Sequence, residues 1–195
     1  MSQATQPLIN FTSERLAFGP MTPEYRVQAL AWINDFAVSA PRAMTIRPYT
    51  SDHMATWAER NRANNDILLV IYEQPSFRPI GETGFTNLNL THQTAEFGIM
   101  IGDTSCWGKG YGIEATHRLL AYGFDLLGLH LIWLRVSGSN QRGLRAYQKA
   151  GFREAGRLHE ALRIGRTRYD EIYMECLASE FLARLEQREE VEAAE

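Results

Sequence analysis

The 195-residue sequence has little cysteine and no long apolar run. Cys106 and Cys176 are too few to build a disulfide framework, which favours free thiols in the reducing cytoplasm. No apolar stretch reaches the roughly 18 residues of a membrane span, and Met1–Asn10 lacks the basic and apolar regions of a signal peptide. The histidines contain no i, i+4 pair, so we expect no metal site.

A strong charge of one sign is also missing, since the net charge is only −3. Residues 186–195 contain five Glu and one Arg and carry −4, so the other residues carry +1. The remainder is close to neutral, which argues against a nucleic-acid partner. Apolar residues make up 45% and charged residues 22%, the composition of a globular domain. We therefore expect a single domain over residues 1–185 and a solvated acidic tail over 186–195.

Hydrophobic periodicity and turn residues predict a mixed α/β domain with one large sheet and no internal repeat. The expected strands are Ser13–Phe18, Ile67–Tyr72, Ile80–Leu90 (interrupted by Gly81 and Gly84), Thr94–Ile101, Leu131–Val136, Phe152–Leu162 and Arg168–Leu177. The expected helices run from Pro23 to about Asn34, from a cap at Ser51 or Asp52 to about Asn61, and from near Gly110 to Gly128. A short helix is expected between the loop Ser137–Asn140 and Ala150, and a last one from Ala178 onward. In the helix after Gly110, 3.6-residue spacing predicts an inward stripe of Ile113, His117, Leu120, Phe124 and Leu127.

The most informative segment is a glycine-rich loop between an expected strand and an expected helix. It consists of Trp107, Gly108, Lys109, Gly110, Tyr111 and Gly112. Alternating glycines let backbone N–H groups turn toward one point, and the helix adds free N–H groups and its positive dipole end. Such a loop favours an anion, most often phosphate or pyrophosphate. A tight turn that uses glycine only for steric reasons is the simpler alternative.

Two common phosphate-binding signatures do not fit this loop. The nucleotide P-loop ends in Gly-Lys-Ser/Thr, but here Gly110 follows Lys109. The dinucleotide fingerprint requires a glycine where Ile113 stands, and an acidic residue about 20 positions later that is also missing. The loop is therefore an anion site of another kind.

The loop resembles the acetyl-coenzyme A pyrophosphate loop of the GNAT N-acetyltransferases, written Arg/Gln-x-x-Gly-x-Gly/Ala. Trp107 stands at the start, where that family usually has Arg or Gln. A second family pattern, Asn-x6-Tyr-x-Lys-x-Gly-Phe, is matched by Asn140, Tyr147, Lys149, Gly151 and Phe152. The two patterns occur in the family's order, and the resemblance is to the branch of ribosomal-protein N-terminal and spermidine acetyltransferases.

This resemblance implies the GNAT fold: a single, mixed, mostly antiparallel sheet of about seven strands, flanked by helices and splayed at its central strands. It also implies acetyl-coenzyme A as co-substrate. The cofactor's pantetheine arm would pair with the free backbone of Ile99, Met100 and Ile101, and one of these N–H groups would polarise the thioester carbonyl. The arm would also bond Asn140, and Arg142, Arg145 and Lys149 would reach the adenosine phosphates.

Direct transfer from a thioester to an amine needs a base and an acid. A lysine-like amine has a pKa of about 10.4 and arrives protonated. Glu96, on the strand before the loop, is the candidate base, with a surface carboxylate as the simpler alternative. Tyr147 is the candidate acid for the departing thiolate, with a core aromatic as the alternative.

Family position alone suggests an acceptor pocket. Its candidate residues are Trp32, Phe36, Phe85, Asn87, Tyr169, Asp170 and Glu171. The acceptor is a small-molecule or peptide amine: a protein N-terminus, an aminoglycoside-like drug, a polyamine or an amino sugar. The early segment Trp32–Ala40 holds only one acidic residue, Asp35, which argues against a polyamine. A homodimer is expected from the branch. A non-catalytic acyl-coenzyme A-binding module and a nucleotide-dependent oxidoreductase remain the alternatives.

Overall fold

The computed structural model describes residues 6–42 and 47–192, the side chains of 188–192 excepted. The expectations for Met1–Asn10 and for the tail 186–195 therefore lie partly outside the described residues. One mixed eight-stranded sheet has the order β1-β2-β3-β4-β5-β6-β8-β7. Its strands are β1 (Phe11–Thr12), β2 (Leu16–Pro20), β3 (Ile67–Glu73), β4 (Arg78–Asn89), β5 (Thr94–Ile101), β6 (Leu131–Ser137), β7 (Arg153–Ile164) and β8 (Thr167–Leu177).

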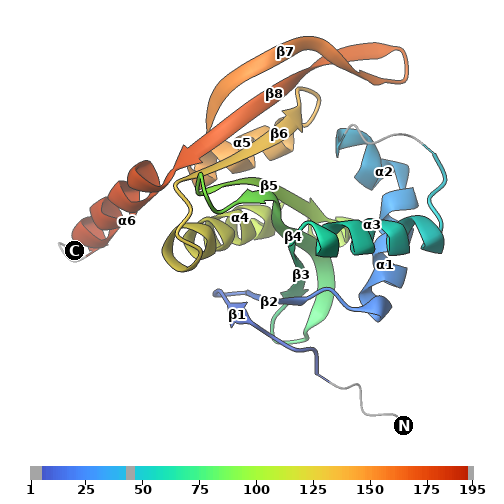
Figure 1. Cartoon of the computed structure of the whole chain (residues 1–195), viewed down its shortest axis with the longest axis horizontal. Coiled ribbons are helices and arrows are strands. Elements are labelled where there is room, and N and C mark those ends of the chain that lie inside the picture. Colours follow the sequence, from blue (N-terminus) through green and yellow to red (C-terminus); the bar gives the residue numbers. More distant parts are fainter. Residues whose placement is uncertain (1–5, 43–46, 193–195) are drawn as a thin grey trace.

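Helices cover both faces of this sheet (Figure 1). They are α1 (Pro23–Asn34), α2 (Phe36–Ser39), α3 (Ser51–Ala63), α4 (Tyr111–Ala121), α5 (Gln141–Ala150) and α6 (Ala178–Glu192), with short 3-10 turns at Ala40–Arg42 (η1) and Thr104–Cys106 (η2) and a π turn at Tyr122–Leu126 (η3). Because neighbouring strand residues point to opposite faces, Leu69 and Ile71 join the core under α4, whereas Val70 joins the core under α1 and α3. No helix in the described residues is long and apolar enough to cross a bilayer.

The predicted splay of the central strands is confirmed. β5 and β6 are the parallel pair of the sheet, and their pairing covers only residues 94–96 and 131–133. Beyond Glu96, β5 pairs with β4 alone, while β6 continues along β8. One edge of β5 over residues 97–101 is therefore open toward the gap between the strands.

Several sequence-based boundaries were wrong, and the reasons are local. Residues 13–16 form a turn closed by the Ser13 N–H to the Leu16 carbonyl, so β2 begins at Leu16 and includes Pro20. Helix α3 is capped by Thr50, whose hydroxyl accepts from His53 N–H while the His53 ring accepts from Thr50 N–H. The strand that the sequence did not predict, β1, has only two residues, which are too few to show a periodic pattern.

The expected interruption of β4 at its glycines was wrong. β4 continues through Gly81 and Gly84, where a Cβ atom would lie only 2.0 Å from a carbonyl oxygen of the neighbouring strand. The expected inward stripe after Gly110 is confirmed only in part, because Leu120 and Phe124 are buried and Leu127 packs against the core. On α4 the buried residues are Ala115, Thr116, Leu119 and Leu120, and Ile113 lines a cavity instead. Helix α4 has only three turns before η3, so its sheet-facing side is set by packing.

Candidate active site

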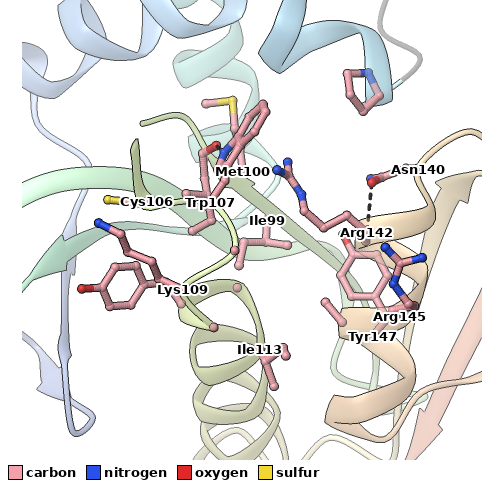
Figure 2. Close-up of a pocket in the computed structure, with 18 of the residues that line it drawn as sticks. Ile99, Met100, Cys106, Trp107, Lys109, Ile113, Asn140, Arg142, Arg145 and Tyr147 are labelled. Atoms are coloured by element: carbon pink, nitrogen blue, oxygen red, sulfur yellow. Dashed lines mark hydrogen bonds between the residues drawn. The ribbon is translucent and has the colours of Figure 1, made fainter. Parts of the chain in front are cut away.

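A cavity of about 640 Å³ lies where the open edge of β5, the glycine loop and α5 meet (Figure 2). All twelve residues predicted to bind the cofactor line it: Ile99, Met100, Ile101, Trp107, Gly108, Lys109, Gly110, Tyr111, Gly112, Asn140, Arg145 and Lys149. Tyr147 lines it too. The structure thus brings together three segments that are separate in the sequence.

The loop geometry is that of an anion-binding turn. Gly108 and Gly110 have φ of +77° and +85°, a left-handed region in which side chains are strained. Gly110 is the N-cap of α4 and provides no side chain to cap it, so the first N–H groups of that helix stay available. The positive end of the α4 dipole therefore faces the cavity without a side-chain cap from the part of the chain that the structure describes.

Residues near the N-terminus, about 100 positions away in the sequence, hold the glycine loop in place. Glu114, on the first turn of α4, accepts hydrogen bonds from Ser13 Oγ at 2.7 Å, from Arg15 N at 2.8 Å and from Arg15 Nε at 2.7 Å. The Arg15 guanidinium in turn donates to the Lys109 carbonyl at 3.0 Å and lies over the Tyr111 ring. The Tyr111 hydroxyl donates to Glu73 at 2.6 Å. These contacts fix the loop before any ligand binds.

A contact between an arginine and an aromatic ring connects the loop to α5. The Arg142 guanidinium carbon lies 3.7 Å from the centroid of the Trp107 ring. The Trp107 indole N–H donates to the Ile101 carbonyl at 2.8 Å, which holds the ring beside the end of β5 (Figure 2). Trp107 therefore takes a packing role at the position where the family usually has a polar residue.

Asn140 begins α5, and its side chain is partly committed to that helix. Its Oδ1 accepts from Gly143 N–H at 2.9 Å as an N-cap (Figure 2). A Cβ atom at position 143 would lie 2.6 Å from Asn140 Nδ2, so glycine there permits the close cap. The cap occupies the Asn140 oxygen and leaves its amide NH₂ as the group for a ligand.

Tyr147 lies where the cavity continues into a second one. Its ring packs edge-on against Phe97 and Phe152, with centroids 6.3 and 6.1 Å away. Burial raises the pKa of the Tyr147 hydroxyl, and the charge of Arg42 partly offsets this. No hydrogen bond to this hydroxyl occurs within the described residues. The hydroxyl is therefore protonated at neutral pH and available to a ligand.

The second cavity has a volume of about 350 Å³ and shares Pro41, Arg42, Ile99, Asn140 and Tyr147 with the first. Glu96 lines it, with a side chain that is only 12% exposed. The Glu96 carboxylate accepts from Asn87 Nδ2 at 2.7 Å and from Arg135 Nε at 2.9 Å. The two candidate catalytic side chains thus lie on one cavity, from β5 and α5.

The acceptor residues predicted by family position are not brought together. Phe85 is fully buried and stacks on Tyr122, so its expected contact with an acceptor is wrong. Phe36 is 56% exposed outside both cavities. Trp32 packs against Tyr25 and onto Gly102, and the side-chain amide of Asn87 donates a hydrogen bond to Glu96. Tyr169 and Asp170 line a separate hollow between α5 and the β7–β8 hairpin, and of this set only Glu171 reaches the second cavity.

Sequence reasoning missed several wall residues. They are Val38, Pro41 and Arg42 from α2 and η1, Arg135 and Ser137 from β6, and Leu162 from β7. The segment from Asp35 to Thr50 has no periodic pattern to indicate that it approaches the cavity. Arg135 reads as an ordinary outward residue of a strand, and only its ion pair with Glu96 distinguishes it.

The two cavities differ in charge. None of the described residues that line the first cavity is acidic. Five of them are basic: Arg42, Lys109, Arg142, Arg145 and Lys149. The second cavity has two carboxylates, Glu96 and Glu171, beside Arg42 and Arg135. Among the described residues there is no group of three or more His, Cys, Asp or Glu that is able to hold a metal ion. A basic first cavity with a glycine loop suits a polyphosphate ligand.

Comparison with known proteins agrees with this geometry. Residues 15–153 match the family model of the acetyltransferase (GNAT) domain. The chain is 31% identical to the spermidine N(1)-acetyltransferase of Vibrio cholerae over 140 residues, which cover 71% of this chain and 80% of that enzyme. It is also 36% identical to the human alpha/beta-tubulin-N-acetyltransferase 9, over 75 residues that cover 36% of each protein.

Solved structures give the same result. The crystal structure of the Vibrio cholerae spermidine N-acetyltransferase in complex with CoA and spermine aligns with a TM-score of 0.79 and 25% identity, covering 87% of this chain and 99% of that one. Another structure of that enzyme is dodecameric. The chain therefore belongs to the GNAT acetyltransferase family, and it is an N-acetyltransferase of that family.

Proposed function

We propose that this protein transfers an acetyl group from acetyl-coenzyme A directly to a primary amine, within a ternary complex. One observation carries the proposal: the open β5 edge, the glycine loop and the Tyr147 hydroxyl face one cavity, which opens into a second cavity containing Glu96. The first cavity suits the long phosphorylated cofactor, and the second suits the amine. Acetyl-coenzyme A supplies the activated thioester.

The residues of the first cavity fit that ligand. The N–H groups at Gly110 and in the first turn of α4 would hold the pyrophosphate. The open edge of β5 at Ile99, Met100 and Ile101 would pair with the pantetheine amides as an added strand. The amide NH₂ of Asn140 would donate to the same arm, and Arg145 and Lys149 would meet the phosphates at the cavity rim.

The proton route uses Glu96 and Tyr147. The protonated amine first releases a proton toward Glu96, directly or through water, which frees the lone pair of its nitrogen. The nitrogen then forms a bond to the acetyl carbon as the carbon–sulfur bond breaks, and it loses a second proton to water. Tyr147 donates its proton to the leaving sulfur. Burial raises the pKa of Tyr147 and also that of the thiolate, so burial does not by itself prevent the transfer.

The test is a thiol-release assay with a panel of primary amines, together with thermal unfolding. Coenzyme A at about 100 times its Kd stabilises the fold by about 2.7 kcal/mol, and we expect smaller shifts with NAD and ATP. A shift with NAD but none with coenzyme A contradicts the proposal. A shift with coenzyme A but no thiol release from any amine indicates the non-catalytic binding module.

Self-association is the remaining part of the proposal. β7 is an edge strand of the sheet, and it has the exposed Leu158. Such an edge favours pairing with another copy, and a relative's dodecamer is in line with this. We propose a homodimer as the smallest unit. Light scattering that shows a 22.2 kDa monomer at micromolar concentration contradicts it.

A further inference from the structure

In the second cavity both carboxylates form ion pairs with the same arginine. Arg135 lies 2.9 Å from Glu96 and 3.8 Å from Glu171, so one guanidinium holds both carboxylates of the wall. The Ser137 hydroxyl on the same wall is neutral and shares a hydrogen bond with Ser139. A polycation that entered this cavity would find no carboxylate without an arginine partner among its described lining residues.

Arg42, unlike these two carboxylates, has no ion-pair partner among the described residues. It lies at the end of η1, lines both cavities and shares the wall with Tyr147. No ion pair or hydrogen bond to its guanidinium occurs within residues 6–42 and 47–192. Burial raises the pKa of Tyr147 and of Glu82, and the charge of Arg42 partly offsets this effect at both groups.

Glu82 does not neutralise Arg42. The two form no ion pair within 4.0 Å, and the Glu82 carboxylate instead accepts from the Tyr25 hydroxyl at 3.2 Å. Burial raises the pKa of Glu82, which favours its neutral form. Arg42 is exposed and lines both cavities, and its positive charge has no anionic partner among the described residues.

We propose that the acceptor is an amine that also carries an anionic group, a carboxylate or a phosphate, and that Arg42 binds this group. The inference rests on the proposed function and names its substrate class. Arginine donates in a planar fork that matches carboxylate and phosphate oxygens. With its anion on Arg42, the acceptor places its amine in the cavity lined by Glu96 and Tyr147. A polyamine places positive charge beside Arg42 and is a poor acceptor.

The experiment uses matched pairs of acceptors in the thiol-release assay. The pairs are an α-amino acid with its methyl ester, and phosphoethanolamine with ethanolamine, with spermidine measured alongside. We expect kcat/KM for at least one anionic member to exceed that of its neutral partner by at least about tenfold, and to exceed that of spermidine. The pair that shows the larger ratio identifies the carboxylate or the phosphate as the anion.

Three variants assign the preference to Arg42. Arg42→Gln removes the ratio within a pair by raising KM for the anionic member only, and Arg42→Lys restores part of it. Arg163→Gln is the matched control, because Arg163 lies on β7, bonds the Gly165 carbonyl and lines neither cavity. A ratio near one in the wild type, or spermidine as the best acceptor, overturns the proposal. So does an Arg42→Gln variant that raises only the KM for acetyl-coenzyme A, since Arg42 then serves the cofactor.

Calorimetry separates this proposal from the proposed function. Binding of the same acceptors is measured in the presence of coenzyme A, where no transfer takes place. Anion-selective binding that Arg42→Gln abolishes, in a protein without thiol release, supports the anion site and contradicts the acetyltransferase function. Thiol release without anion selectivity contradicts the anion site alone. Neither release nor selective binding contradicts both.

Discussion

The two cavities were built in different ways from the same chain. The wall of the first comes mostly from two continuous segments, residues 99–113 and 140–149, whose glycines and cap residues dictate their own backbone. The wall of the second takes residues from η1, β5, β6, α5, β7 and β8. The comparison teaches that the first cavity, which we propose for the cofactor, is encoded in local motifs. The second cavity, which we propose for the acceptor, depends on which distant segments meet.

Tyr147 belongs to both cavities, and its replacement has the largest expected effect. Tyr147→Phe keeps the ring packing on Phe97 and Phe152 but removes the acid, so the rate of single-turnover transfer falls by roughly 10²–10⁴-fold. Coenzyme A affinity and stability change little, because the lost interaction forms in the transition state. A core role would give the reverse pattern, with lower stability and a normal transfer rate.

The pH dependence of the same reaction sharpens this assignment. Because burial raises the pKa of Tyr147 above its usual value of about 10, the hydroxyl stays protonated through that pH. The single-turnover rate is therefore expected not to decline on the alkaline side up to about pH 10. An alkaline decline in the wild type that disappears in Tyr147→Phe would show that the hydroxyl titrates below this range.

A substitution in the glycine loop of the first cavity is expected to have the next largest effect, on the binding of coenzyme A. Gly110→Val places a β-branched residue at φ +85° and blocks the approach of phosphate to the backbone, so the thermal shift with coenzyme A disappears. The control is Gly165→Val, at φ +61° in the β7–β8 turn with no atom near its Cβ position. It carries a similar strain and is expected to lose stability while it keeps the shift. Loss of the shift in both variants would assign the effect to folding.

Replacement of Glu114 tests whether the glycine loop needs its contacts with the distant residues Ser13 and Arg15 to keep its shape. Glu114→Gln weakens the bonds to Ser13 and Arg15 that hold the loop, and is expected to cost about 1–3 kcal/mol of unfolding free energy. Glu59→Gln, on the exposed side of α3, is the control. Urea unfolding measures both variants. Equal stabilities would show that the loop holds its shape without its distant anchor.

The acidic tail is expected to have the smallest effect. Removal of residues 186–195 retains Leu185, which packs against the core, and is expected to change the unfolding free energy by less than about 0.5 kcal/mol. Turnover in the thiol-release assay is expected to remain normal. A loss of activity would place the end of α6 in an interface between copies of the chain.

The sequence by itself determined the fold class and the strand–loop–helix around Gly110, because a left-handed glycine, a helix cap and a strand of alternating residues are decided by neighbours a few positions away. Its resemblance to the GNAT family added the other predicted cofactor residues, and all twelve line the first cavity. Only the tertiary structure removed Phe85 from the acceptor site, paired Arg135 with Glu96 and brought Arg42 beside Tyr147. These contacts join residues 39 to 105 positions apart, and no local backbone preference records such a separation; the packing of helices on a splayed sheet decides it.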